Sequence, residues 1–111
     1  MAFLTRKRVG NKKYLQVVHN YRENGKHRQR VLMHVGPYVS MEHALADWHR
    51  YVDAPPRDFS PSNRRYHAEK IEEVRAFLSA HNITVDEAEL KRLRGLREHD
   101  RWAENDALVS V

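Results

Sequence analysis

The sequence predicts an α+β fold: a three-stranded antiparallel β-meander packed by one helix, followed by a C-terminal αα-hairpin. Two turn signals, Gly10-Asn11 and Asn24-Gly25, separate three stretches that are rich in Tyr, Val and Leu, residue types that strands favour. After Gly36-Pro37 the apolar side chains recur every three to four residues, which is the period of an amphipathic helix. A segment with three prolines, residues 53–61, then divides the helical part of the chain in two.

The second turn predicts the register of the sheet. Asn-Gly is the strongest short hairpin signal, because both central residues of a type I′ turn need a positive φ. With Asn24 and Gly25 at the tip, the numbers of paired residues add up to 49 along both strands. One face then carries the pairs Tyr14/Val35, Gln16/Met33, Val18/Val31 and Asn20/Gln29, and the other carries Leu15/His34, Val17/Leu32, His19/Arg30 and Tyr21/Arg28. We expect the first helix to cover the face of Val18 and to leave the face of Arg28 exposed.

The first predicted helix spans residues 41–52 and begins after Ser40, a residue type that caps helices. Its apolar stripe consists of Met41, Ala44, Leu45, Trp48 and Val52. Such a short helix is marginal alone, so we expect it to lie on the sheet.

Two more helices are predicted after the prolines. One runs from about residue 63 to Ala80, and the other follows a capping box in which Thr84 and Glu87 satisfy each other's backbone amides and ends near Glu104. These limits divide the chain into three parts: a basic β-β-β-α domain (1–53), a proline-rich linker (54–62) and a helical hairpin (63–106).

The charge is distributed unevenly along the chain. The 111 residues have a net charge of +5, but residues 1–35 contain nine Lys or Arg and one acid, a net charge of +8, and the rest carries −3. Such asymmetry favours a polyanionic partner for the first third. There is no cysteine, which excludes disulfides and Cys-ligated zinc. Without a signal peptide or a long apolar run, we expect a cytoplasmic protein that makes no membrane contact and is nucleoid-associated when it binds DNA.

The hairpin around Asn24-Gly25 is the predicted nucleic-acid site. A β-ribbon fits the major groove of duplex DNA, where Arg bonds guanine edges and Asn or Gln bonds adenine. The candidate residues are Lys12, Lys13, Asn20, Tyr21, Arg22, Asn24, Lys26, Arg28, Gln29 and Arg30. We expect Arg28, Gln29 and Arg30 near the bases, and Lys12, Lys13, Arg22 and Lys26 on phosphates. The alternative is a solvated sheet whose cations only protect its edges from aggregation.

Residues 13–37, KYLQVVHNYRENGKHRQRVLMHVGP, resemble the amino-terminal region of certain bacterial insertion-sequence transposases of the DDE type. The matching residues are Tyr14, Tyr21, Arg22, Glu23, Gly25, Lys26, Arg28, Gln29, Arg30, Val31 and Gly36. The resemblance implies that this region helps to recognise element DNA. The family carries its catalytic carboxylates on a long ribonuclease-H-like core, for which a chain ending at Val111 has no room. We therefore expect a binding domain without its enzyme: a truncated relative, a domesticated remnant or a fragment.

The remaining polar residues do not indicate catalysis. His43 and Asp47 are four residues apart on one predicted helix, but no HExxH or comparable ligand set accompanies them. No nucleophile signature and no Gly-rich phosphate loop occurs. We predict neither an enzyme nor a metal site, and no cofactor.

The predicted function is therefore non-catalytic binding of double-stranded DNA in the major groove. An RNA-binding module that stacks bases on Tyr14 or Tyr21 is one alternative. Another is a protein-interaction module that acts through the C-terminal helices, which could also form a homodimer with Trp102 in the contact. A helix-turn-helix is disfavoured, because the acidic residues 86–89 open the last helix at the end that would enter a groove.

Overall fold

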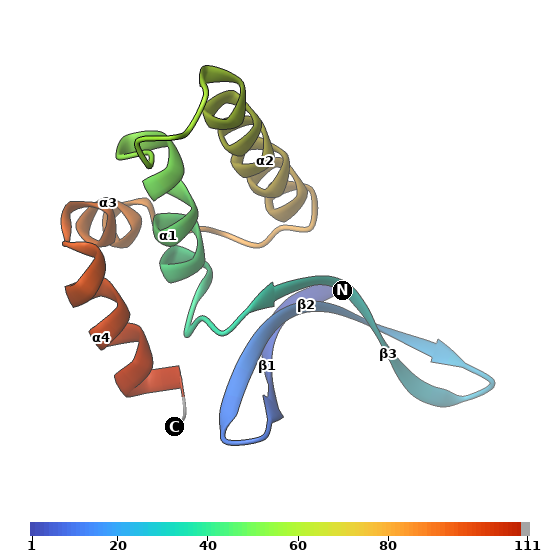
Figure 1. The fold of residues 1–111 in the computed structure, drawn as a ribbon. Coiled ribbons are helices and arrows are strands. Elements are labelled where there is room, and N and C mark those ends of the chain that lie inside the picture. Colours follow the sequence, from blue (N-terminus) through green and yellow to red (C-terminus); the bar gives the residue numbers. More distant parts are fainter. Residues whose placement is uncertain (110–111) are drawn as a thin grey trace.

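The computed structural model describes residues 1–109, which form one three-stranded antiparallel sheet and four helices. The elements are β1 (Ala2–Val9), β2 (Lys12–Glu23), β3 (Lys26–Gly36), α1 (Met41–Asp53), α2 (Pro61–Ala80), α3 (Glu87–Gly95) and α4 (Glu98–Val109). The sheet order is β1-β2-β3, so the predicted α+β class and the meander are confirmed. The helices gather at one end of the sheet, and the hairpin of β2 and β3 extends away from them (Figure 1). Within the described residues, no helix is long and apolar enough to cross a membrane.

Local signals determine where the hairpin turns and where α1 begins. Asn24 and Gly25 both have positive φ, 52° and 79°, as a type I′ turn requires. Ser40 caps α1, because its hydroxyl accepts a hydrogen bond from the backbone N–H of His43 at 3.1 Å. Both predictions from the sequence are confirmed.

The predicted register is correct near the tip and wrong at the base of the hairpin. From Glu23↔Lys26 to Val18↔Val31 the partners are as predicted, but Val17 then pairs with Met33 and Leu15 with Gly36. The predicted pairs Tyr14/Val35, Leu15/His34, Gln16/Met33 and Val17/Leu32 are therefore wrong. Each shift leaves one extra residue on β3, as in a β-bulge, and bulges bend and twist the strand that contains them.

The first helix packs against the other face of the sheet from the one predicted. Leu15 and Val17 belong to the main hydrophobic cluster with residues of α1. On the face assigned to the helix, Tyr14 and Val31 are exposed, although Gln16 and Val18 between them are buried. The two bulges bring Met33 onto the same face as Leu15 and Val17. The face of Arg28 is therefore the face on which the first helix packs, and Arg28 is exposed because the hairpin extends beyond the helices.

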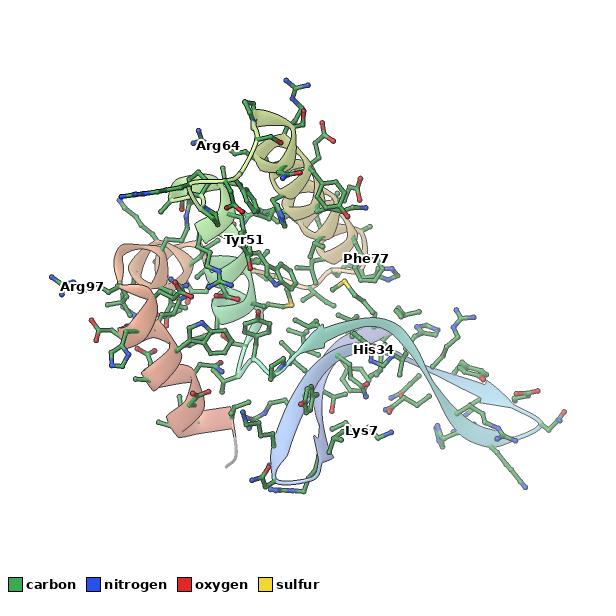
Figure 2. All side chains as sticks on the ribbon, viewed as in Figure 1. Lys7, His34, Tyr51, Arg64, Phe77 and Arg97 are labelled. Atoms are coloured by element: carbon green, nitrogen blue, oxygen red, sulfur yellow. The ribbon has the colours of Figure 1, made fainter. Side chains whose placement is uncertain are left out.

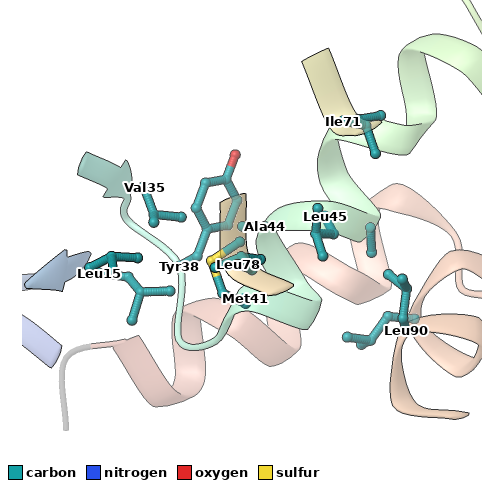
Figure 3. Close-up of a cluster of buried hydrophobic side chains, with 12 residues drawn as sticks. Leu15, Val35, Tyr38, Met41, Ala44, Leu45, Ile71, Leu78 and Leu90 are labelled. Atoms are coloured by element: carbon teal, nitrogen blue, oxygen red, sulfur yellow. The ribbon is translucent and has the colours of Figure 1, made fainter. Parts of the chain in front are cut away.

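The core joins the sheet to α1, α2 and α3. Met41, Ala44 and Leu45 on α1 are almost completely buried, and they pack with side chains of β2, β3 and the next two helices (Figure 3). α1 lies between the other helices and meets the sheet at its amino end (Figure 1). The division of the chain into two folding units by residues 54–62 stays a prediction. α1, which precedes this linker, contacts β3 before it and α2, α3 and α4 after it.

The last predicted helix is two helices in the structure. α3 ends at Gly95, Leu96 is extended with ψ 151°, and α4 begins at Glu98. Glycine is a poor helix former, and the break at this point redirects the chain. The predicted capping box is also wrong, because the cap is Asp86, whose carboxylate accepts from the N–H of Glu89 at 3.1 Å.

α4 returns to the connection between β3 and α1 and is fastened there by buried polar groups. The Asn105 side chain accepts from the N–H of Val39 at 2.8 Å and donates to the carbonyl of Pro37 at 2.9 Å. Trp102 lies against Tyr38, with ring centroids 5.6 Å apart. The tryptophan that the sequence suggested for self-association therefore contacts the chain itself.

The turn at the end of β3 allows a first prediction. Gly36 has φ +128°, and a Cβ placed there would meet the Tyr38 ring at 3.2 Å. We expect Gly36→Ala to lower the free energy of unfolding by about 1–3 kcal/mol, since an L-residue is strained in that conformation. The matched control is Gly95→Ala, where φ is ordinary and nothing lies within 4 Å, and which should stabilise by up to about 1 kcal/mol. Urea unfolding measures the free energy of unfolding of both variants. The same change in both would contradict the backbone strain that we assign to alanine at position 36.

Candidate nucleic-acid interface

The most exposed part of the sheet is a two-stranded ribbon formed by residues 20–29. The pairing of β1 with β2 ends at Ala2↔His19, whereas β2 and β3 stay paired from Asn20↔Gln29 to Glu23↔Lys26. Every residue of the ribbon is exposed. From Asn20 to Asn24 the ribbon extends about 14 Å beyond β1, at the usual rise per residue of a strand. Its side chains leave the backbone in both directions (Figure 2).

The ribbon has two faces of different character. One, here the Arg28 face, carries Tyr21, Glu23, Lys26 and Arg28, and the cross-strand pair of His19 and Arg30 continues it at the base. The other, here the Gln29 face, carries Asn20, Arg22, His27 and Gln29. The three residues predicted near the bases are therefore divided, because Arg28 and Arg30 point to one side and Gln29 to the other.

Polar contacts on the Gln29 face lie within that face. The Gln29 side-chain amide donates to Asn20 Oδ1 at 3.2 Å, and Arg22 Nη2 lies 3.4 Å from His27 Nε2. These pairs cross from one strand to the other, so they brace the ribbon.

The Arg28 face keeps its cations available. The only acid on the ribbon, Glu23, lies 3.9 Å from Arg28 Nε, and both side chains are more than half exposed. An ion pair this long and this exposed contributes little, so an incoming phosphate can replace it. Lys26 has no ion-pair partner among residues 1–109. The ribbon therefore presents cations that internal contacts do not neutralise.

The predicted lysines Lys12 and Lys13 lie at the opposite end of β2, beside the turn at Gly10. Along the strand they are at most about 37 Å from the tip. Arg6, in the first strand, is already engaged, because its guanidinium donates to the carbonyl of Leu108 at 3.2 Å. The structure thus separates the ten predicted residues into a ribbon group and a distant lysine pair.

A notch at the base of the ribbon contains a residue that sequence reasoning missed. It is lined by His19 and Arg30 of the sheet and, across from them, by Ala80, His81 and Asn82 at the end of α2, and it has a volume of about 280 Å³. Phe77 marks this end of α2, close above the sheet (Figure 2). The missed residue is His81, which directly follows the predicted end of the second helix at Ala80 and was not among the candidate site residues. No local signal could place it beside His19, since the two are brought together by the packing of α2.

The buried polar groups of the helices form hydrogen bonds and ion pairs within the chain. The Tyr38 hydroxyl donates to Asp47 at 2.6 Å, and Arg101 Nη2 donates to the other oxygen of that carboxylate at 3.3 Å. Burial and the hydrogen bond to Asp47 raise the pKa of Tyr38 well above its ordinary value. His43, the other residue of the i, i+4 pair, contacts Ser40 and Glu104 instead. No group of three or more potential metal ligands occurs in residues 1–109.

Part of the chain matches a known family. Residues 4–55 match the family model of the IS1634 family transposase, N-terminal domain. The matched region spans most of β1, all of β2 and β3 and all of α1, and it contains all ten predicted site residues. No curated protein and no solved structure matches the chain. The predicted resemblance to the N-terminal region of insertion-sequence transposases is confirmed, and it extends beyond residues 13–37 to most of the sheet and the first helix.

Proposed function

We propose, from the likeness of residues 4–55 to a transposase N-terminal domain, that the chain binds double-stranded DNA of a mobile element through its ribbon. The observation that carries this proposal is the exposure of residues 20–29 on both faces, together with their cations. The major groove is about 12 Å wide and admits a two-stranded ribbon. The helices hold the base of the sheet, so the ribbon is presented from a folded support.

The two faces suggest different roles for the predicted residues. Arg28 on the Arg28 face has the planar fork that bonds guanine O6 and N7. Gln29 is the adenine-reading candidate of the opposite face, but it is bonded to Asn20. Arg22 and Lys26 beside the tip suit phosphates on either side of the groove.

Lys12 and Lys13 suit a second contact with the backbone. Their separation from the tip along β2, at most about 37 Å, is close to one helical turn of B-DNA, about 34–36 Å.

The proposed role involves no chemistry on the DNA. Catalysis of strand transfer or cleavage by metal ions needs clustered carboxylates. In the described chain, the ribbon contains the single acid Glu23, while Asp47 and Asp53 are paired with Arg101 and Arg94. These two carboxylates are therefore engaged in ion pairs within the chain.

Fluorescence anisotropy of labelled random duplex DNA, single-stranded DNA and RNA across a salt series tests the proposal. We expect the duplex to bind most tightly, with log K falling against log[salt] at a slope of about −4 to −5, because four to six cations would release counterions. Preference for single strands or RNA would favour the RNA-binding alternative. No binding to any of the three at low salt would overturn the proposal and favour a protein-interaction module.

A homodimer through the C-terminal helices stays a prediction. The apolar side chains that would form it, Leu90, Leu93 and Trp102, contact the rest of the chain. Sedimentation equilibrium of the free protein tests the dimer, since the chain has a mass of 13.2 kDa. A mass of one chain at all concentrations would exclude it.

A further inference from the structure

The notch at the base of the ribbon gathers ionisable nitrogen atoms from separate elements. His19 and Arg30 are cross-strand partners on β2 and β3, and His81 follows the last turn of α2. These three residues line the same cavity of about 280 Å³. None of the residues that line it in the described chain is acidic. The notch therefore brings one guanidinium and two imidazoles together, with no acidic side chain among the described residues that line it.

The contacts of His19 describe the notch further. Its Nδ1 lies 3.3 Å from the amino group of Met1, and its ring stacks with that of Tyr21 at 6.4 Å. Partial burial and, after it, the charges of the Met1 amino group, Arg30 and His81 lower the pKa of His19. The charged groups that face His19 are all cationic, and the residues facing it from β1 and from either side of His81, Ala2, Ala80 and Asn82, carry no charge. An anion that entered the notch would favour the protonated form of the His19 imidazole.

We propose that the notch formed by His19, Arg30 and His81 binds a backbone phosphate of the duplex whose groove the ribbon enters. This inference rests on the proposed function and makes it more specific. It assigns His19 and His81 to binding, and it moves Arg30 from the bases to the backbone. Two donors from the sheet and one from α2 surround a single phosphate, and a phosphate oxygen accepts hydrogen bonds from Arg and protonated His alike.

The notch also determines which face of the ribbon meets the DNA. His19 and Arg30 continue the Arg28 face, and α2 stands on that same side of the sheet. From Arg30 to Lys26 the strand rises about 14 Å, which is comparable with the groove width of about 12 Å. A phosphate in the notch and another at Lys26 would then flank the groove, with Arg28 and Tyr21 over the base edges between them.

A pH dependence of binding follows from this assignment. In the free protein partial burial and, after it, the neighbouring cations lower the pKa of His19 below its ordinary value of 6.5 and favour the neutral imidazole. A bound phosphate attracts the protonated imidazole and raises the pKa, so binding takes up a proton. Affinity is then highest at low pH and falls as the pH rises through the pKa of His19 in the complex. A rise of about one pKa unit on binding corresponds to about a tenfold gain in affinity at low pH.

The test compares duplex affinity at pH 5.5 and pH 7.5, at constant ionic strength, in the full chain and in the double variant His19→Gln/His81→Gln. We expect the full chain to bind about three- to tenfold more tightly at pH 5.5 than at pH 7.5, and the double variant to lose most of this difference. The matched control is His34→Gln/His99→Gln, which removes two exposed histidines outside the notch and the ribbon. The control should keep most of the pH dependence.

The outcomes separate this inference from the proposed function. Salt-sensitive duplex binding with the same pH dependence in both double variants would overturn the phosphate notch and leave the ribbon proposal intact. Absence of duplex binding in the full chain would overturn both. Inorganic phosphate at matched ionic strength should leave duplex binding unchanged. If it removes the pH dependence, the notch takes a free anion and not the DNA backbone.

Discussion

Replacement of Asp47 by alanine is expected to lower the free energy of unfolding by about 3–5 kcal/mol. The Asp47 carboxylate and the Arg101 guanidinium that donates to it are both about 6% exposed. Without Asp47 the charge of Arg101 would remain buried with no partner, and the Tyr38 hydroxyl would lose its 2.6 Å hydrogen bond. The contact joins α1 to α4, so its loss should unfold the chain at lower urea. Equilibrium urea unfolding with an unchanged m-value would measure the effect.

The matched control is Asp53→Ala, on the same helix and also paired with an arginine. Asp53 and Arg94 lie 2.8 Å apart but are about 40% exposed, so the expected loss is about 0–1 kcal/mol. The double variant Asp47→Ala/Arg101→Met should recover part of the stability, because it removes the unpaired charge as well. A loss below 1 kcal/mol in the Asp47 variant would show that the buried pair does not hold α4 in place.

Replacement of Arg28 and Arg30 by alanine is expected to weaken duplex binding at least thirtyfold. The estimate takes about 1 kcal/mol or more for each arginine at a base edge or phosphate. Both side chains are exposed and stabilise no core, so the variant should unfold at the same urea concentration as the original chain. Anisotropy at one salt concentration gives the change in affinity, and the salt series should show a shallower slope.

Arg64→Ala/Arg65→Ala provides the control for that variant. It removes two exposed arginines, so the net charge is the same, but Arg64 on α2 points away from the sheet (Figure 2). We expect its affinity to change less than threefold, an effect of overall charge alone. Similar losses in both double variants would mean that the DNA is held by the general charge of the protein and not by the ribbon.

The features that could be predicted from the sequence are those with local causes. Asn24 and Gly25 tolerate the positive φ angles that the hairpin turn requires. The hydroxyl of Ser40 caps the first turn of α1. The candidate cations of the ribbon could be found in the same way, because charge and turn signal occur in one short segment.

The features that could not be predicted depend on contacts between distant segments. The shifts near Leu32 and Val35 change which residues of β3 share the face of Leu15, and a rule that counts residues from the turn cannot detect them. The chain changes direction after Gly95, and α4 then reaches Pro37. That contact joins segments far apart in the sequence. His81 joins the notch through the position of α2, which no spacing in the sequence records.

The bonds that Asn105 makes to Pro37 and Val39 have a consequence for how the protein is made. The ribosome synthesises the sheet and α1 first, yet the backbone groups that connect them obtain their partners only from α4. The region that matches the transposase domain would therefore leave the ribosome before the backbone groups of Pro37 and Val39 have their hydrogen-bond partner. It would reach its native packing once residues up to Asn105 have left the exit tunnel. Until then a nascent chain would expose Met41 and Leu45, both buried in the finished protein, to chaperones and proteases.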